Sequence, residues 1–126
     1  MDRPTITADV VFLSPQEGGR QFPPDVTQPR RYRPHVVIQD RTVRRAALDA
    51  NNAPLEEYLG VTFLSGPELH FGVSARCTLD LPYYPDLAYS QVVPGATFTV
   101  REGRHVVGHG VVIERSDPLG PDRRAG

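Results

Sequence analysis

Short apolar stretches rich in β-branched residues recur along this chain, and polar segments containing proline or glycine separate them. Such stretches predict strands rather than helices. The first strand is expected in ITADVVFLS, Ile6–Ser14, and the second within YRPHVVIQD, Tyr32–Asp40, where Pro34 suits the first residue or an edge position. Downstream, VTFLSG predicts a strand, Gly66–Pro67 a turn, and PELHFGVSARCTLDLP a long strand.

The segment ATFTVREGRHVVGHGVVIER, Ala96–Arg115, carries the strongest strand signal in the chain. Two β-rich arms flank Glu102–Gly103–Arg104, and this predicts a tight hairpin. Because side chains alternate across a strand, the second arm is expected to divide its residues between two faces. One face takes Val106, Gly108, Gly110 and Val112, and the other takes His105, Val107, His109, Val111 and Ile113.

Two segments between the predicted strands have no single interpretation. Within Arg41–Gly60, the residues Ala46–Leu48 end a strand or begin a helical turn, Asn51–Asn52 marks a turn, and Leu55–Leu59 suits one short helical turn. The segment YYPDLAYSQVVPG is expected to be a loop whose aromatic side chains cover the core.

The pattern leaves five or six strands and no helix longer than two turns, and the 13 prolines and 11 glycines fit a turn-rich β architecture. A small sheet must bury one face and protect its edges, so we expect an all-β fold, an antiparallel barrel. The 126 residues fit a single domain over residues 1–115, and residues 116–126 are expected to form a disordered tail.

Composition limits the ligands and the cellular compartment that we expect for the protein. The net charge is −1, and all 14 basic residues are arginine, whose planar fork of donors suits phosphate and carboxylate groups. The single cysteine allows no disulfide within the chain, the first residues lack an apolar signal core, and no apolar run approaches the ~20 residues of a membrane helix. We therefore expect a cytoplasmic protein with no membrane partner.

The glycine pair in VVFLSPQEGGRQFPP raises the question of a phosphate cradle. A phosphate-binding P-loop needs a lysine, which this chain lacks, and no G-x-G-x-x-G motif is present. We expect instead that Gly18 and Gly19 adopt positive φ or pass close to neighbouring backbone. Glu17 and Arg20 would then flank the turn with charges available for a partner.

Metal or nucleophilic chemistry has little support in the sequence. His105 and His109 lie ~13 Å apart on a strand, too far apart to bind one metal ion. Cys77 falls within a predicted strand and is expected to be a buried, inert thiol. No metal or cofactor is expected, and a small enzyme using Cys77 or a histidine is the least favoured of three functions.

Arginines cluster in PRRYRPH, where Arg30, Arg31 and Arg33 surround Tyr32, and again at Arg44 and Arg45. Two interpretations are open. A solvated basic edge would deter strands from pairing between molecules. Alternatively, these residues form a docking surface for a phosphate backbone or an acidic protein.

Three of these segments together resemble the C-terminal barrel domain of bacterial elongation factor Tu: VVFLSPQEGGRQFPP, RYRPHVVI and PGATFTVREGRHVVGHGVV. In that family a strand ending in L-S precedes an acid, Gly-Gly-Arg and a proline-containing loop. A Y-R-P block follows, and an R-E-G-G-R hairpin stands near the end. The resemblance spans Ile6–Arg115 and implies a six-stranded antiparallel barrel without the family's GTPase domain or second barrel.

The family's barrel docks on its GTPase domain, supports the exchange factor and contacts the T-stem of aminoacyl-tRNA. The resemblance implies a T-stem contact for Glu102, and for His35, which stands where the family has a glutamine. The family's contacting threonine falls near Val43–Arg45. Arg104 and His105 depart from the family, replacing a glycine and an arginine of the turn.

From this resemblance we expect a non-catalytic binding module that docks a protein partner. The alternative is RNA binding linked to translation. The candidate contact residues for either partner are Glu17, Arg20, Arg30, Arg31, Arg33, His35, Arg44, Arg45, Arg101, Glu102 and Arg104, while Gly18, Gly19 and Gly103 shape the loops.

Overall fold

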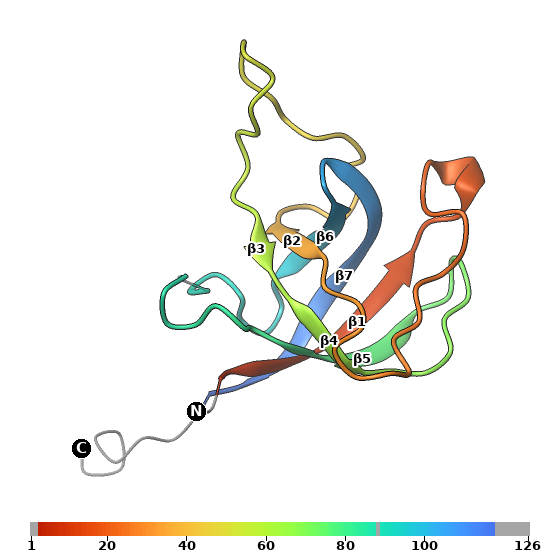
Figure 1. The fold of residues 1–126 in the computed structure, drawn as a ribbon, viewed down its shortest axis with the longest axis vertical. Helices are drawn as coiled ribbons and strands as arrows, with labels where there is room; N and C mark the ends of the chain where they lie inside the picture. Colours follow the sequence, from red (N-terminus) through yellow and green to blue (C-terminus); the bar gives the residue numbers. More distant parts are fainter. Residues whose placement is uncertain (1–2, 88, 118–126) are drawn as a thin grey trace.

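The computed structural model describes residues 3–87 and 89–117, and its regular structure is almost entirely β. The strands are β1 (Thr5–Phe12), β2 (His35–Ile38), β3 (Leu59–Gly60), β4 (Thr62–Ser65), β5 (Ala75–Asp80), β6 (Thr97–Glu102) and β7 (His105–Ser116), with one 3-10 turn, η1 (Pro15–Glu17). They form one antiparallel sheet in the order β3-β2-β6-β7-β1-β5-β4 (Figure 1). The all-β class is confirmed.

The sheet curls into a half-barrel whose two end strands, β3 and β4, are consecutive in the chain and separated only by Val61. Around this junction the backbone amide of Val61 donates to the carbonyl of Pro34 at 3.0 Å, and that of Phe63 donates to Tyr32 at 2.9 Å. The segment before β2 therefore bonds to the β4 side while β2 itself pairs with β3. The predicted count of six strands is wrong, because the ladder breaks at Val61 and leaves two short strands.

The core lies inside the curl of the sheet. In β1 the alternate residues Ile6, Ala8, Val10 and Phe12 are buried, and the residues between them are half-buried. Aromatic rings from other segments complete the core, including Phe63, whose ring centre lies 6.3 Å from that of Phe12. Each fully buried side chain of this size contributes about 1.5–3 kcal/mol.

The predicted hairpin of β6 and β7 is confirmed. Glu102 pairs with His105, so the loop contains only Gly103 and Arg104, and Gly103 has φ +60, as the first loop position of a type II′ turn requires. A bulge after Val100 shifts the register and turns Val107 into the core. The predicted faces hold for Gly108, Gly110 and Val112 but are wrong for Val107 and for Val106, which pairs with Arg101 and lies outside the core cluster.

The loop after β4 is longer than expected. Strand β5 begins only at Ala75, and the residues before it form turns in which Gly72, at φ +77, donates its amide to Phe12 O at 2.9 Å. This bond fixes the loop to the end of β1. The long strand predicted from Pro67 is therefore wrong in its first half.

Residues 39–58 form an arm that projects away from the sheet (Figure 1). Asn52, at φ +62, confirms the turn at the tip. Leu55 donates its amide to Ala47 O at 2.9 Å, and Leu48 bridges to Pro54. The helical turn suggested for Leu55–Leu59 is wrong, because these bonds run across an extended arm.

The C-terminal strand is also longer than expected. Strand β7 runs to Ser116, and Asp117 accepts a hydrogen bond from Arg115 at 2.7 Å, so the predicted tail does not begin at residue 116. Residues 118–126 of that predicted tail lie outside the described residues. Within the described part of the chain, no helix has the length and apolar content to cross a bilayer.

Candidate binding surfaces

The glycine loop is held by its own backbone and by an acid cap. Glu17 accepts hydrogen bonds from the amide and the hydroxyl of Ser14, at 3.0 and 3.1 Å, and these bonds lower the pKa of Glu17. Gly18 has φ +86. A Cβ on Gly19 would lie 2.0 Å from the carbonyl oxygen of Leu13. Both the positive φ and the close backbone approach predicted for this pair are confirmed.

Arg20, Tyr32 and Glu102 meet at one junction, although they come from the three separate segments of the resemblance. Arg20 Nε lies 2.9 Å from Glu102 Oε2, and its guanidinium carbon lies 5.5 Å from the centre of the Tyr32 ring. Tyr32 also donates its hydroxyl to Glu102 at 2.6 Å. Burial, followed by this bond to a carboxylate, raises the pKa of Tyr32. Arg20 is therefore paired within the chain, which corrects its expected role as a free charge.

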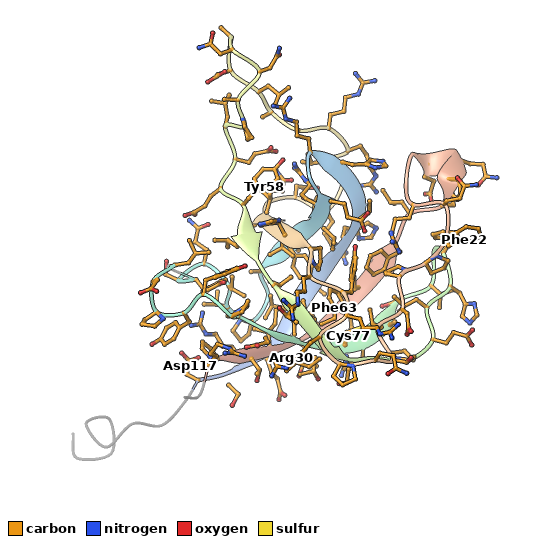
Figure 2. All side chains as sticks on the ribbon, in the orientation of Figure 1. Phe22, Arg30, Tyr58, Phe63, Cys77 and Asp117 are labelled. Atoms are coloured by element: carbon orange, nitrogen blue, oxygen red, sulfur yellow. The ribbon has the colours of Figure 1, made fainter. Side chains whose placement is uncertain are left out.

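Phe22 extends from this junction into solvent with 74% of its surface exposed. Arg20 Nη1 donates to its carbonyl oxygen at 3.2 Å. Beside it lies a groove of about 490 Å³, called here the Phe22 groove, lined by Pro23, Pro24, Asp25, Val26, Thr27, Glu68 and Leu69. Pro24, Val26 and Leu69 are buried and form its floor, while Asp25 and Glu68 are exposed carboxylates. Figure 2 shows Phe22 at the edge of the molecule, next to η1.

A second groove, of about 240 Å³, is basic and is called here the arginine groove. Asp80 lies beside it with its side chain only 3% exposed. Arg3 Nη2 donates to Asp80 at 2.8 Å and Arg30 Nη1 at 3.0 Å. Burial opposes the ionised form of Asp80, but the two guanidinium groups outweigh it and hold its pKa below the ordinary value. Two cations therefore share one anion at this site.

The remaining wall of the arginine groove adds further donors and an aromatic ring. Arg33 and His35 line it and are exposed, and Arg33 Nε donates to Arg30 O at 3.1 Å. Tyr83 also lines the groove, and its ring lies over Gly60, where an added Cβ would come within 2.4 Å of the ring. The predicted residues Arg30, Arg33 and His35 are thus brought together.

Arg101 is wholly buried, with 0% of its side chain exposed, so the prediction that it contacts a partner is wrong. It donates to Glu56 Oε2 at 2.9 Å, to Gln39 Oε1 at 2.7 Å and to the hydroxyl of Tyr58 at 2.7 Å. Glu56 also accepts from the amide of Ala47 at 3.1 Å. Burial raises the pKa of Glu56, but these bonds reverse the shift and lower it. Arg101 therefore attaches the base of the arm to the sheet.

The other predicted residues are not gathered at either groove. Arg31 is exposed between Arg30 and Arg33 but does not line the arginine groove. Arg104 is exposed in the hairpin loop. Arg44 and Arg45 are exposed on the arm.

The structure bears on the predicted thiol and on metal binding. Cys77 is 1% exposed, and burial raises its pKa to about 11, so the thiol is protonated at neutral pH. No cluster of three or more His, Cys, Asp or Glu side chains suitable for a metal ion occurs among residues 3–87 and 89–117.

Sequence reasoning missed Arg3 and Tyr83 in the arginine groove, Asp80 beside it, Glu68 in the Phe22 groove, and Phe22 itself. A signal was present for Asp80, a charged residue between the buried Leu79 and Leu81, and for Phe22, an aromatic residue in a polar, proline-rich loop. Arg3 precedes the first strand, and nothing in the local pattern connects it with Asp80.

No family model matches the chain, and the search of curated proteins found no match either.

Proposed function

We propose that this chain is a non-catalytic binding module that docks a protein partner, and that its fold is a stand-alone barrel of the elongation factor Tu domain III type. The resemblance has one structural support. Its three matched segments meet through Arg20, Tyr32 and Glu102. The sheet has seven strands, and counting β3 and β4 as one interrupted strand would reconcile it with the six that the resemblance implies.

The observation that carries the docking proposal is the exposure of Phe22 on a preorganised loop. Exposed aromatic side chains are enriched at protein interfaces, where a few of them supply most of the binding energy. The loop is already ordered through Glu17, Gly19 and Arg20. Binding therefore costs little further loop entropy.

The Phe22 groove indicates the chemistry of the partner. Its floor is apolar and its rim carries Asp25 and Glu68. Asp25 uses Oδ1 to accept two hydrogen bonds from Thr27, while the carboxylate stays exposed. The partner segment is therefore an apolar one with basic side chains beside it, because opposite charges at the rim favour the encounter.

RNA binding is the second candidate, and one observation favours it. Arg30, Arg31, Arg33 and His35 are exposed along one segment, so guanidinium groups are available for phosphate and 2′-hydroxyl contacts. The net charge of −1 weighs against strong sequence-independent binding.

Affinity capture from the native cell lysate, with and without nuclease, separates these functions. The wild type is compared with Phe22→Ser and with Leu55→Ser, a control that also changes an exposed apolar residue but lies on the arm. We expect a protein that survives nuclease treatment, is lost with Phe22→Ser and is kept with Leu55→Ser. Its direct binding to the purified chain would then be measured.

Capture that disappears after nuclease treatment and is unaffected by Phe22→Ser would instead support RNA binding. A salt titration with tRNA tests that alternative. Binding that weakens steeply as salt rises is expected for phosphate contacts. No complex at low salt removes the RNA proposal.

A further inference from the structure

We propose that the arginine groove is a binding site for a phosphate monoester, separate from the docking surface at Phe22. The site has three independent features. They are an excess of positive charge, a backbone held in an unfavourable conformation, and a groove whose volume suits a phosphate group. None of them is needed for docking through Phe22.

The charge excess comes from the shared carboxylate. Arg3, Arg30 and Arg33 line the groove, and Asp80 is the one acid that pairs with any of them in the described part of the chain. Three guanidinium groups facing one carboxylate leave the groove with an excess of two positive charges, although Arg3 and Arg30 both contact Asp80. A phosphate monoester carries nearly two negative charges at neutral pH, whereas a carboxylate or a phosphodiester carries one. The monoester therefore matches the site best.

The donors are available to a ligand. Arg30 reaches Asp80 through Nη1, and its side chain remains 50% exposed, so other N–H groups of its fork face solvent. Arg33 uses Nε for the carbonyl oxygen of Arg30, which leaves its terminal nitrogens for a ligand. Guanidinium forks bind phosphate oxygens in pairs, with geometric specificity.

Arg30 is held in a conformation that few residues other than glycine adopt, with φ +65. Its backbone amide donates to Phe63 O at 2.9 Å, and its carbonyl accepts from Arg33. Left-handed backbone is unfavourable at a residue that carries a Cβ, and outliers of this kind cluster at active sites and ligand clamps. Here the conformation fixes the backbone between Arg30 and Arg33 before any ligand arrives.

The walls limit the ligand to a small group. The groove measures about 240 Å³, and the ring of Tyr83, which lines it, stands over Gly60. A phosphate group fits this space, and the Tyr83 ring in the lining offers an apolar contact for the ester group.

Isothermal titration calorimetry of the full chain tests the site with four probes: inorganic phosphate, phenyl phosphate, acetate, and a dinucleoside monophosphate without a terminal phosphate. We expect both phosphates to bind, phenyl phosphate more tightly because of Tyr83. Acetate and the phosphodiester are expected to bind at least about tenfold more weakly. Equal binding of acetate or the phosphodiester would overturn the proposal, as would no saturable binding of either phosphate.

Arg33→Gln is the decisive variant because Arg33 lines the groove without contacting Asp80, and so leaves that ion pair intact. Its matched control is Arg31→Gln, an exposed neighbour outside the groove. We expect Arg33→Gln to weaken phosphate binding about tenfold or more while the chain stays folded by circular dichroism, and Arg31→Gln to bind like the wild type. Equal losses in the two variants would show attraction to general basic charge and contradict a site.

Discussion

Arg20 and Glu102 form an ion pair of 2.9 Å that joins the glycine loop after β1 to the hairpin between β6 and β7. The same carboxylate accepts the hydroxyl of Tyr32 at 2.6 Å. Three segments far apart in the sequence are thus fixed to one another at one side of the sheet. Phe22 projects from this junction, so its position depends on the ion pair between Arg20 in the loop and Glu102 outside it.

A double-mutant cycle with Arg20→Gln and Glu102→Gln measures this coupling. Both side chains are about one-third exposed, so solvent screens the pair. We expect a coupling of about 0.5 kcal/mol in the free energy of unfolding, measured by urea denaturation. Coupling above about 2 kcal/mol would place the pair in an environment more buried than the structure shows.

Gly18 and Gly19 differ in what an added methyl group would meet. Gly19→Ala places Cβ against the carbonyl of Leu13, so the loop must move, and we expect a loss above about 2 kcal/mol. Gly18→Ala meets nothing within 4 Å, and its φ of +86 costs only about 1 kcal/mol. Thermal unfolding of both variants checks the order, and a reversed order would refute the close approach at Gly19.

The buried pair of Arg101 and Glu56 is expected to contribute more to stability than any exposed arginine. Arg101→Met leaves Glu56 without its main partner, and we expect a loss of about 3 kcal/mol. The control Arg104→Met, three residues along and exposed, should stay within about 0.5 kcal/mol. Hydrogen exchange should rise at the amide of Ala47, which donates to Glu56. Similar losses in the two variants would contradict the burial of Arg101.

Asp80 makes stability depend on acid pH. Its pKa is lowered in the folded state, so its contribution is fully present above its ordinary value of 3.8 and is lost as the pH falls through the lower folded value. Urea unfolding of the wild type from about pH 5 to pH 2 should show this loss. Asp80→Asn should show a flatter acid limb, and an identical slope would show that Asp80 is not held in its ionised form.

Cys77 should resist alkylation while the protein is folded. Burial raises its pKa to about 11, and the thiolate is the reactive form. We expect iodoacetamide at pH 8 to label the chain only after denaturation, followed by mass spectrometry. Rapid labelling of the native protein would contradict the buried position of the thiol.

The local sequence pattern was sufficient to predict the regular parts of the strands and turns. The strand β1, the turn at Gly103 and the behaviour of the glycine pair were all predicted, because β-branched runs and positive φ are local properties. The local sequence pattern did not predict the bulge that turns Val107 inward, or the break at Val61 between β3 and β4. Both depend on bonds to distant segments.

The candidate surfaces were less predictable than the fold for the same reason. The arginine-rich segment pointed to Arg30 and Arg33. How much positive charge remains there depends on Asp80, which the tertiary structure places beside Arg30. Arg101 looked like its surface neighbours, although a partner on the arm, Glu56, makes it a buried residue. Charge counted along a sequence does not tell which arginines are already neutralised.

Photo-crosslinking in the native cell tests the docking proposal most directly. A benzophenone amino acid is placed at Phe22 and, in a control, at Val93, another exposed apolar position in a different turn. The proposal predicts one protein cross-linked from position 22, resistant to nuclease and absent from position 93. Identical products from both positions, or products from position 22 that contain only RNA, would contradict it.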